Sequence, residues 1–371
     1  MTREAAVFRL HADCVFVPGA KNAAIYDLTR RRIVSVPAAY GRAYESIDGR
    51  YSQADIERDE REEGDGRRLA GFVRYLIAEE MGDFIDDPAR FPRIEPGWEA
   101  PGEVQNAIVD VDARRHDFAS IFAQLDRLGC EYAQIRCYSD VLEIEEIHAI
   151  GRAASHTSIR GVELMLPESA KYPDAALEDL VRSELIFVRV VVHSASEDRT
   201  LGVAFGDSVG EGISEVRTIH MLRARLRSSD DCGRIGQASL QPPDVPLFEE
   251  LKRYNGCLNG KIAIDAEGRI KNCPSLPTAY GRVDTMPLAE ALNAPGFRSL
   301  WSIAKDSIAV CRDCEYRYAC TDCRAFRSDP DDLHSKPAKC GYDPYTGRWD
   351  LRIDDPTPVT PGFAHVRPNP T

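Results

Sequence analysis

Seven cysteines in the last third of the chain have the residue type and the spacing of metal ligands. They are Cys257, Cys273, Cys311, Cys314, Cys320, Cys323 and Cys340. Residues 311–323 contain two CxxC units that are five residues apart, and a CxxC turn directs two sulfurs at one metal centre. Cysteine thiolates bind zinc and iron-sulfur clusters. The spacing therefore predicts that the C-terminal part of the chain binds metal.

The short gap between the two CxxC units favours iron-sulfur clusters over zinc. Zinc ribbons separate their two CxxC units by about 15 to 20 residues. Two-cluster ferredoxins show the alternative, in which a compact run of cysteines sends its last member to the other cluster. We therefore expect iron-sulfur clusters here, with zinc as the less favoured alternative.

The first two of these cysteines flank a predicted hairpin. Residues 261–265 and 269–271 have the pattern of two short strands, with a turn at 266–268. Gly268 can adopt the positive φ that such a turn needs. The hairpin would bring Cys273 back beside Cys257, so that two thiolates lie together.

Alternating strands and helices precede the cysteine-rich region and predict an α/β fold. Strands are expected at 106–112, 132–138, 159–166 and 185–193, and helices at 118–128, 141–154 and 175–182. This alternation implies parallel strands joined by right-handed crossovers, in an open sheet or a partial barrel. Asp112, Arg136, Glu163 and His193 lie near expected strand ends, where such folds bind ligands, although loops or solvent could equally satisfy them.

The first ninety residues have the pattern of a small separate domain. Runs at 8–10, 15–17, 23–28 and 32–36 predict an antiparallel sheet, and a helix begins near Arg67 after a charged segment at 55–68. A linker that contains Pro88, Pro92, Pro96 and Pro101 follows. We expect domains over 1–90, 103–230 and 231–350, with a proline-rich tail at 351–371.

Composition limits the location and the partners of the protein. A net charge of -13 over 371 residues argues against unaided binding to nucleic acid, which depends on Lys and Arg contacts. The sequence shows neither a signal peptide nor a membrane span, so we expect a cytoplasmic protein. Eleven cysteines in a reducing compartment are expected to serve metals rather than disulfides.

The cysteine pattern resembles the SPASM domain, the auxiliary-cluster module of many radical SAM (S-adenosylmethionine) peptide-modifying enzymes. The matching pattern is C-x10-G-x4-C, then C-x2-C-x5-C-x2-C, then a distant cysteine. The sequence around Cys257 (CLNGKI) and Cys340 (KCGYDPYTG) is similar to the SPASM protein of grasp-with-spasm systems, which make ribosomally synthesised and modified peptides (RiPPs) of the graspetide type. Such systems also encode a precursor peptide and an ATP-grasp ligase. The resemblance runs from about Phe8 to Trp349 and is strongest after Cys232.

The resemblance implies two 4Fe-4S clusters and a particular division of the cysteines between them. The first cluster would take Cys257, Cys273 and Cys323. The second would take Cys311, Cys314, Cys320 and Cys340. Seven ligands leave one position open on two clusters. Either an iron is open to substrate, or another residue, for which Cys232 is the best candidate, is the eighth ligand.

A radical SAM enzyme would carry C-x3-C-x2-C after its first barrel strand. Residues 110–118 contain no cysteine, and the motif occurs nowhere in the chain. The resemblance therefore implies a degenerate radical SAM-like barrel that does not use SAM. Cys14, Cys130 and Cys137 lie in expected strands, and core packing is the favoured interpretation for them.

The N-terminal unit is similar to the winged-helix recognition element that binds RiPP leader peptides. Such modules add an extended leader to the edge of a sheet. The edge would comprise Ile33, Val34 and Val36, and the groove helix would present Phe72, Val73 and Leu76. The simpler alternative is that these six residues form the core of the unit.

Three functions remain open from the sequence, and they leave undecided whether the protein is an enzyme. The leading hypothesis is an iron-sulfur maturation protein that binds a precursor peptide and acts with an ATP-grasp ligase. The second is a redox or Lewis-acid enzyme that modifies the peptide at an open iron. The third is a scaffold that zinc or clusters hold together.

Overall fold

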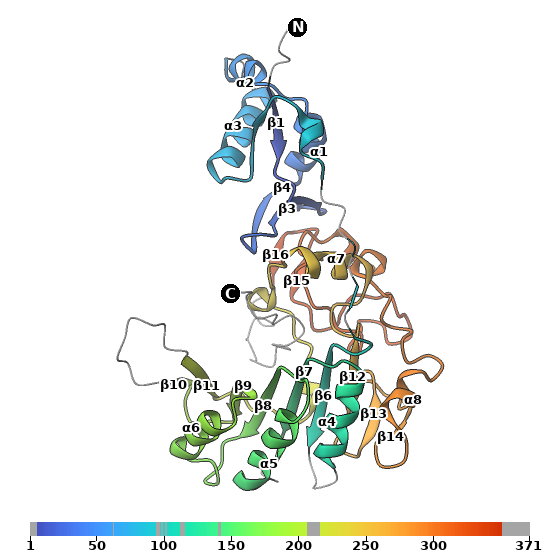
Figure 1. Ribbon diagram of the computed structural model, residues 1–371. Helices are drawn as coiled ribbons and strands as arrows, with labels where there is room; N and C mark the ends of the chain where they lie inside the picture. Colours follow the sequence, from blue (N-terminus) through green and yellow to red (C-terminus); the bar gives the residue numbers. More distant parts are fainter. Residues whose placement is uncertain are drawn as a thin grey trace.

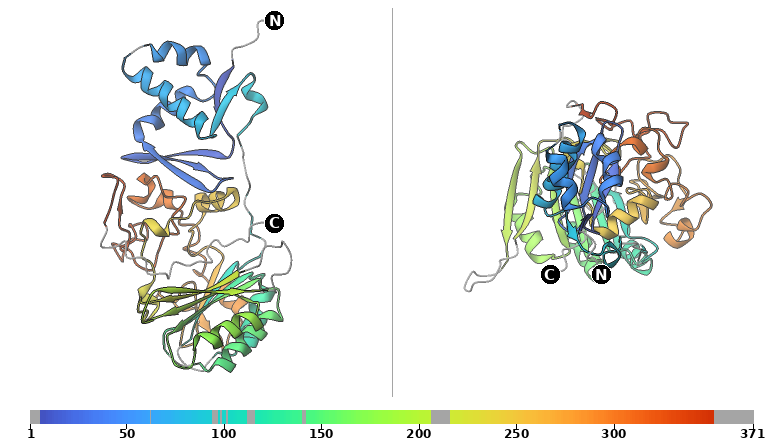
Figure 2. Two further views of the ribbon diagram at one scale, coloured as in Figure 1. Left: turned by 90° about the vertical axis from the view of Figure 1, so that its left-hand side faces the viewer. Right: turned by 90° about the horizontal axis from the view of Figure 1, so that it is seen from above.

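The chain folds into three parts that follow one another along its long axis (Figure 1). The computed structural model describes residues 6–61, 63–93, 97, 99–100, 102–111, 116–139, 142–205 and 216–350. An N-terminal unit lies at one end, a large sheet lies at the other, and the cysteine-rich region lies between them (Figure 2). Pro96, Pro101, Asp112 and the tail at 351–371 lie outside the described residues.

The N-terminal unit combines two small antiparallel sheets with three helices. The strands are β1 (Val7–Leu10), β2 (Cys14–Pro18), β3 (Asn22–Asp27), β4 (Arg32–Pro37) and β5 (Gly82–Ile85), and the helices are α1 (Ala38–Ile47), α2 (Gln53–Glu60) and α3 (Asp65–Ala78). Strands β2, β3 and β4 form the predicted antiparallel sheet in that order. Strand β1 pairs instead with β5, more than seventy residues later in the chain.

The three-stranded sheet of this unit is buried on both faces. Side chains that include Ile25 and Val36 pack on one side, in a core shared with α1 and α3. Tyr26, on the opposite face, packs against Phe248 of α7 (Val245–Arg253), a helix of the cysteine-rich region. The alternation of side chains along a strand supplies both faces. The N-terminal unit therefore shares an apolar core with the cysteine-rich region.

A mixed sheet of nine strands confirms the α/β fold class. Its order is β10-β11-β9-β8-β7-β6-β12-β13-β14. The pairings from β11 through to β12 are all parallel, and the pairings at both ends are antiparallel. The sheet is open, because its first and last strands do not pair with each other. Its members are β6 (Asn106–Val111), β7 (Tyr132–Cys137), β8 (Gly161–Pro167), β9 (Phe187–His193), β10 (Arg199–Ala204), β11 (Val216–Leu222), β12 (Lys261–Ile264), β13 (Arg269–Lys271) and β14 (Gly281–Arg282).

Three helices cover one face of this sheet (Figure 2). They are α4 (Phe118–Arg127), α5 (Ile144–Ser155) and α6 (Asp174–Ser183). The apolar side chains of their inner faces, such as Phe122 and Leu177, pack with alternate strand residues such as Val109 and Leu164. The opposite face of the sheet is turned toward the cysteine-rich region and carries buried polar side chains, among them Arg136.

The remaining elements are short and lie mostly in the cysteine-rich region. They are α8 (Leu288–Leu292), β15 (Tyr342–Asp343), β16 (Arg348–Trp349) and the 3-10 helices η1 (Pro88–Arg90), η2 (Ser229–Asp231), η3 (Gln237–Ser239), η4 (Lys305–Ser307) and η5 (Cys311–Asp313). Strand β12 joins the large sheet through β6, so the sheet extends across the expected domain boundary at residue 230. None of the helices in the described part of the chain has the length and apolar character needed to cross a membrane.

Candidate metal centres

The predicted hairpin forms and fixes the first pair of cysteines. Strands β12 and β13 pair antiparallel, and Gly268 has a φ of 80° at the turn. The Asn255 side chain accepts hydrogen bonds from the backbone N–H groups of Cys257 and Leu258, at 3.1 and 3.0 Å. Asn272 donates to the Lys261 carbonyl at 2.8 Å. These buried amides hold the loop before the hairpin against its second strand.

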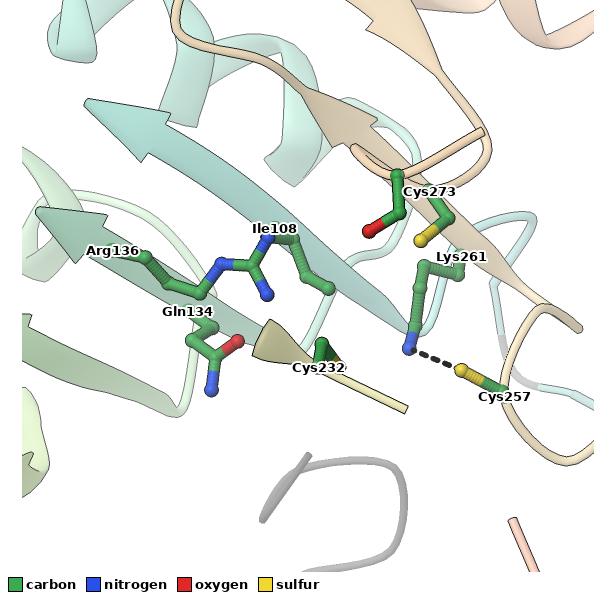
Figure 3. A pocket seen from close by; sticks show the side chains of 8 residues that line it. Ile108, Gln134, Arg136, Cys232, Cys257, Lys261 and Cys273 are labelled. Atoms are coloured by element: carbon green, nitrogen blue, oxygen red, sulfur yellow. Dashed lines mark hydrogen bonds between the residues drawn. The ribbon is translucent and has the colours of Figure 1, made fainter. Parts of the chain in front are cut away.

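Cys232 lies with Cys257 and Cys273 around one small cavity (Figure 3). The cavity lies against the polar face of the large sheet, from which Arg136, Ile108 and Lys261 extend into it. These three side chains come from the adjacent strands β7, β6 and β12. The remaining lining residues are Gln134 and Ser275.

Cys323 completes this first group. A methyl group on Gly233 would lie 2.9 Å from the Cys323 sulfur, so the backbone next to Cys232 touches that side chain. Burial, and then the nearby thiolates of Cys257, Cys232 and Cys273, raise the pKa of Cys323 above its ordinary value. The first group therefore contains four cysteines, including the residue that was the best sequence candidate for an eighth ligand.

The second group gathers around the buried amine of Lys305. The amine lies 3.2 Å from the Cys320 sulfur and 4.0 Å from the Cys311 sulfur. Cys340 and Cys314 are electrostatic neighbours of Cys320. The Tyr316 backbone N–H also points at the Cys314 sulfur, at 3.4 Å. Cys311, Cys314, Cys320 and Cys340 thus form a second set of four.

Burial disfavours the charged thiolate form of the cysteines in both groups. Burial and neighbouring thiolates raise the pKa of Cys273 to about 11. Burial, with Asp322 and two cysteines and against the opposing effect of Lys305, raises the pKa of Cys311 to about 11. Several negative sulfurs in a low-dielectric interior require a compensating positive charge. A metal centre would supply it, because cysteine thiols release their protons when they bind metal.

Each group also has a buried lysine beside it. Lys261 is 1% exposed and its amine lies 3.7 Å from the Cys257 sulfur. Lys305 is 4% exposed and pairs with Asp322 at 3.2 Å as well as with the cysteines. Burial disfavours the charge of Lys305, but Asp322 and the cysteines raise its pKa well above the usual range. Buried cations at both groups fit a metal centre whose total charge is negative.

The spacing of the sulfurs bears on the choice between a cluster and a single ion. Four thiolates on one tetrahedral zinc ion lie about 3.8 Å apart, given Zn–S bonds of about 2.3 Å. Within the described residues, the one set of three potential ligand atoms that all lie within 4.8 Å of one another is that of His11, Asp13 and Cys14, in the N-terminal unit. No three sulfurs of either cysteine group are that close. Neither group is therefore preformed for a single tetrahedral zinc ion.

The polar strand residues singled out in the sequence have different surroundings. Glu163 is the third residue of β8 rather than near its end, and it accepts a hydrogen bond from Gln134 at 2.7 Å. His193 lies at the end of β9, with its Nε2 2.9 Å from the Cys137 carbonyl. Arg136 pairs with Asp110 at 2.6 Å. Of the three, Arg136 alone lines the cavity of the first cysteine group.

The six residues expected to bind a peptide lie mainly in a core. Phe72, Val73 and Leu76 are buried in the core of the N-terminal unit, as is Val36. Ile33 and Val34 are partly buried against the two cores on either side of their strand. Strand β4 nevertheless stands at an edge of its sheet, with β3 as its one partner among the described strands. The backbone edge of β4 is therefore the remaining candidate for binding the leader peptide. The six side chains pack behind it in the cores.

Sequence reasoning missed the polar and charged groups that surround the cysteines. Lys305 and Asp322 are buried at the second group, and Tyr138 lies beside the first. The role of Lys261 could have been inferred from the sequence, because this lysine begins the short strand that follows Cys257. The expected core cysteines, Cys14, Cys130 and Cys137, are confirmed as buried.

No protein-family model matches the chain, and no curated protein is significantly similar to it. The functional assignment therefore depends on the geometry of the site and on the cysteine pattern.

Proposed function

We propose that the protein belongs to the class that holds two iron-sulfur clusters, one in each cysteine group. The observation that carries this proposal is the assembly of eight cysteines into two buried sets of four. Four thiolates are the usual ligand set of a 4Fe-4S cluster. The short gap between the two CxxC units and the two buried lysines support a cluster rather than zinc.

Within that class, the particular function we propose is that of a SPASM-type maturation protein for a ribosomally made peptide. It would bind a precursor peptide and assist an ATP-grasp ligase, without SAM radical chemistry. The cysteine spacing supports the SPASM assignment, and the absence of C-x3-C-x2-C from the sequence supports a degenerate barrel. The open, mostly parallel sheet with helices on one face is compatible with such a barrel.

Four cysteines in each group favour a supporting role for the clusters over Lewis-acid catalysis. A cluster with four thiolate ligands has no iron position open to substrate. The chain's own residues would then bind and orient the peptide, while the clusters hold the central region together and are able to carry electrons. The N-terminal unit would receive the leader at the edge of β4.

Metal analysis of anaerobically purified protein tests whether the protein holds two iron-sulfur clusters. We expect about eight iron and eight sulfide per chain from two 4Fe-4S clusters. A predominance of zinc with no sulfide would replace the proposal with the zinc-held scaffold.

Reconstitution tests the function. Precursor peptide, ligase and ATP are combined with and without this protein, and the product is followed by mass spectrometry. We expect faster or altered modification when the protein is present. If its omission changes neither rate nor product, the maturation role fails. A mass change without the ligase would instead identify the protein as a peptide-modifying enzyme.

A further inference from the structure

Arg136 carries a buried hydrogen-bond donor that has no partner among the residues the structure describes. Its side chain is 2% exposed, and its Nε donates to Asp110 at 2.6 Å. Its Nη2 is buried and has no hydrogen-bond partner among the described residues. The guanidinium extends into the cavity of the first cysteine group, and Cys232 is among its electrostatic neighbours (Figure 3). An unpaired buried donor of this kind is costly, so it indicates a missing acceptor.

Tyr138 carries a second such donor at the same place. Its hydroxyl is buried and has no hydrogen-bond partner in the described part of the chain. The Arg136 guanidinium lies over its ring, 5.7 Å from the centroid. Cys232 and Cys273 are electrostatic neighbours of the hydroxyl. Cys232 is therefore an electrostatic neighbour of both orphaned donors.

Lys261 adds a cation on the other side of the cavity. Its amine contacts the Cys257 sulfur and forms no ion pair with a carboxylate among the described residues. The second group differs, because Lys305 is already paired with Asp322, and Asp322 also accepts from Arg324 at 2.8 Å. The first group thus has donors still available, whereas the charged groups of the second largely satisfy one another.

We propose that Arg136, Tyr138 and Lys261 form a hydrogen-bonding wall for the first centre and raise its reduction potential. This inference rests on the proposed presence of iron-sulfur clusters. The Arg136 Nη2 and the Tyr138 hydroxyl donate to sulfur atoms of the centre, which supplies the acceptors that neither donor finds in the described part of the chain. Hydrogen bonds to sulfur and a nearby positive charge stabilise the more negative, reduced form of a cluster. The large sheet thereby raises the reduction potential of the first centre and not that of the second.

The test is a potentiometric titration of the cluster-loaded full-length protein, followed by EPR. Tyr138→Phe removes one hydroxyl and preserves the ring, and Lys261→Met removes the amine. We expect both substitutions to shift the same one of the two cluster couples to lower potential. Lys305→Met, beside the second group, is the matched control and should shift the other couple. Arg136 is left intact, because its removal would strand the buried Asp110 carboxylate.

A second measurement is needed if the reduction potentials of the two clusters overlap or if Lys261→Met folds poorly. Resonance Raman spectra of the Fe–S stretches in D2O should shift for the wild type, because exchangeable protons bind the sulfurs, and shift less for Tyr138→Phe. Iron and sulfide analysis accompanies each sample. Protein without iron and sulfide would overturn the proposed function. Full iron content, with potentials and isotope shifts that match the wild type in Tyr138→Phe, would overturn this inference alone.

Discussion

Cys232 joins three cysteines that lie 25 to 91 residues further along the chain, and its position beside them makes it our proposed fourth ligand of the first centre. We predict that Cys232→Ser lowers the iron content from about eight to about four per chain, because serine is a poor ligand for a 4Fe-4S cluster. Iron and sulfide analysis with EPR would measure the loss.

Cys130→Ala is the control for that experiment. Cys130 is buried in the core of the large sheet, away from both groups, so its substitution should leave the iron content intact. Unchanged iron and unchanged spectra in Cys232→Ser would mean that the first centre has another fourth ligand or an open position.

Cys130 also provides a test of the pH dependence of stability. Burial raises its pKa from 9.0 to about 12. Below pH 9 the thiol is protonated in both the folded and the unfolded chain. Between about 9 and 12 the unfolded chain loses this proton and the folded chain keeps it, so the free energy of unfolding falls by up to about 1.4 kcal/mol per pH unit.

Denaturant unfolding at about pH 8 and pH 11 measures this effect. We predict a smaller loss of stability on raising the pH for Cys130→Ala than for the wild type. Equal losses in the two proteins would show that the Cys130 thiol does not titrate as its burial requires.

At the scale of single elements, a substitution in strand β4 tests whether the leader peptide binds at the edge of this strand. Ser35 is an exposed residue of this edge strand. A lysine on an edge strand discourages the addition of another strand. We predict that Ser35→Lys weakens binding of the precursor leader by about tenfold or more, measured by fluorescence anisotropy, whereas Ser35→Ala binds as the wild type does. Equal affinities for the two variants would remove β4 as the binding edge.

Regular periodicity explains which elements could be predicted from the sequence. The strands and helices between Asn106 and His193 have clear apolar patterns, and the structure places them within about three residues of the predicted bounds. The strand patterns of the N-terminal unit were equally readable. The hairpin that carries Cys273 was predictable as well, because Gly268 marks its turn.

Other elements depend on long-range contacts that a local pattern does not contain. The pairing of β1 with β5, and of β12 with β6, joins segments far apart in the chain. Helices α1 and α7 were missed. Helix α7 is stabilised by the sheet of the N-terminal unit, through Tyr26. The grouping of Cys232 with Cys323 likewise follows from the fold rather than from spacing.

At the scale of the whole molecule, Phe248 is central to the contact between the N-terminal sheet and the cysteine-rich region. It is 3% exposed, and its ring lies 5.6 Å from that of Tyr26 and 5.0 Å from that of Tyr318. We predict that Phe248→Ala costs about 3 to 5 kcal/mol and speeds hydrogen exchange in β2, β3 and β4. Phe122→Ala, in the core of the large sheet, is the matched control and should leave that exchange unchanged. Similar protection of β3 in both variants would contradict the prediction.

The segment around Cys314, in the second cysteine group, also supports this contact. The Tyr26 hydroxyl donates to the Glu315 carbonyl at 2.8 Å, and the Ala20 N–H donates to the Asp313 carbonyl at 2.8 Å. Both acceptors flank Cys314. We predict that metal removal by anaerobic chelation loosens the N-terminal unit and accelerates limited proteolysis after it. Identical cleavage patterns with and without metal would show that the contact is independent of the centre.

The two cysteine groups are interleaved along the chain. Cys320 belongs to one and Cys323, three positions later, to the other, and the second group closes only with Cys340. The first group is complete only when Cys323 has been synthesised, 91 residues after Cys232, and by then Cys311, Cys314 and Cys320 of the second group are also present. On the proposed assignment, the first centre can therefore be filled only after most ligands of the second have been made, so the two centres are filled at the same stage of biogenesis.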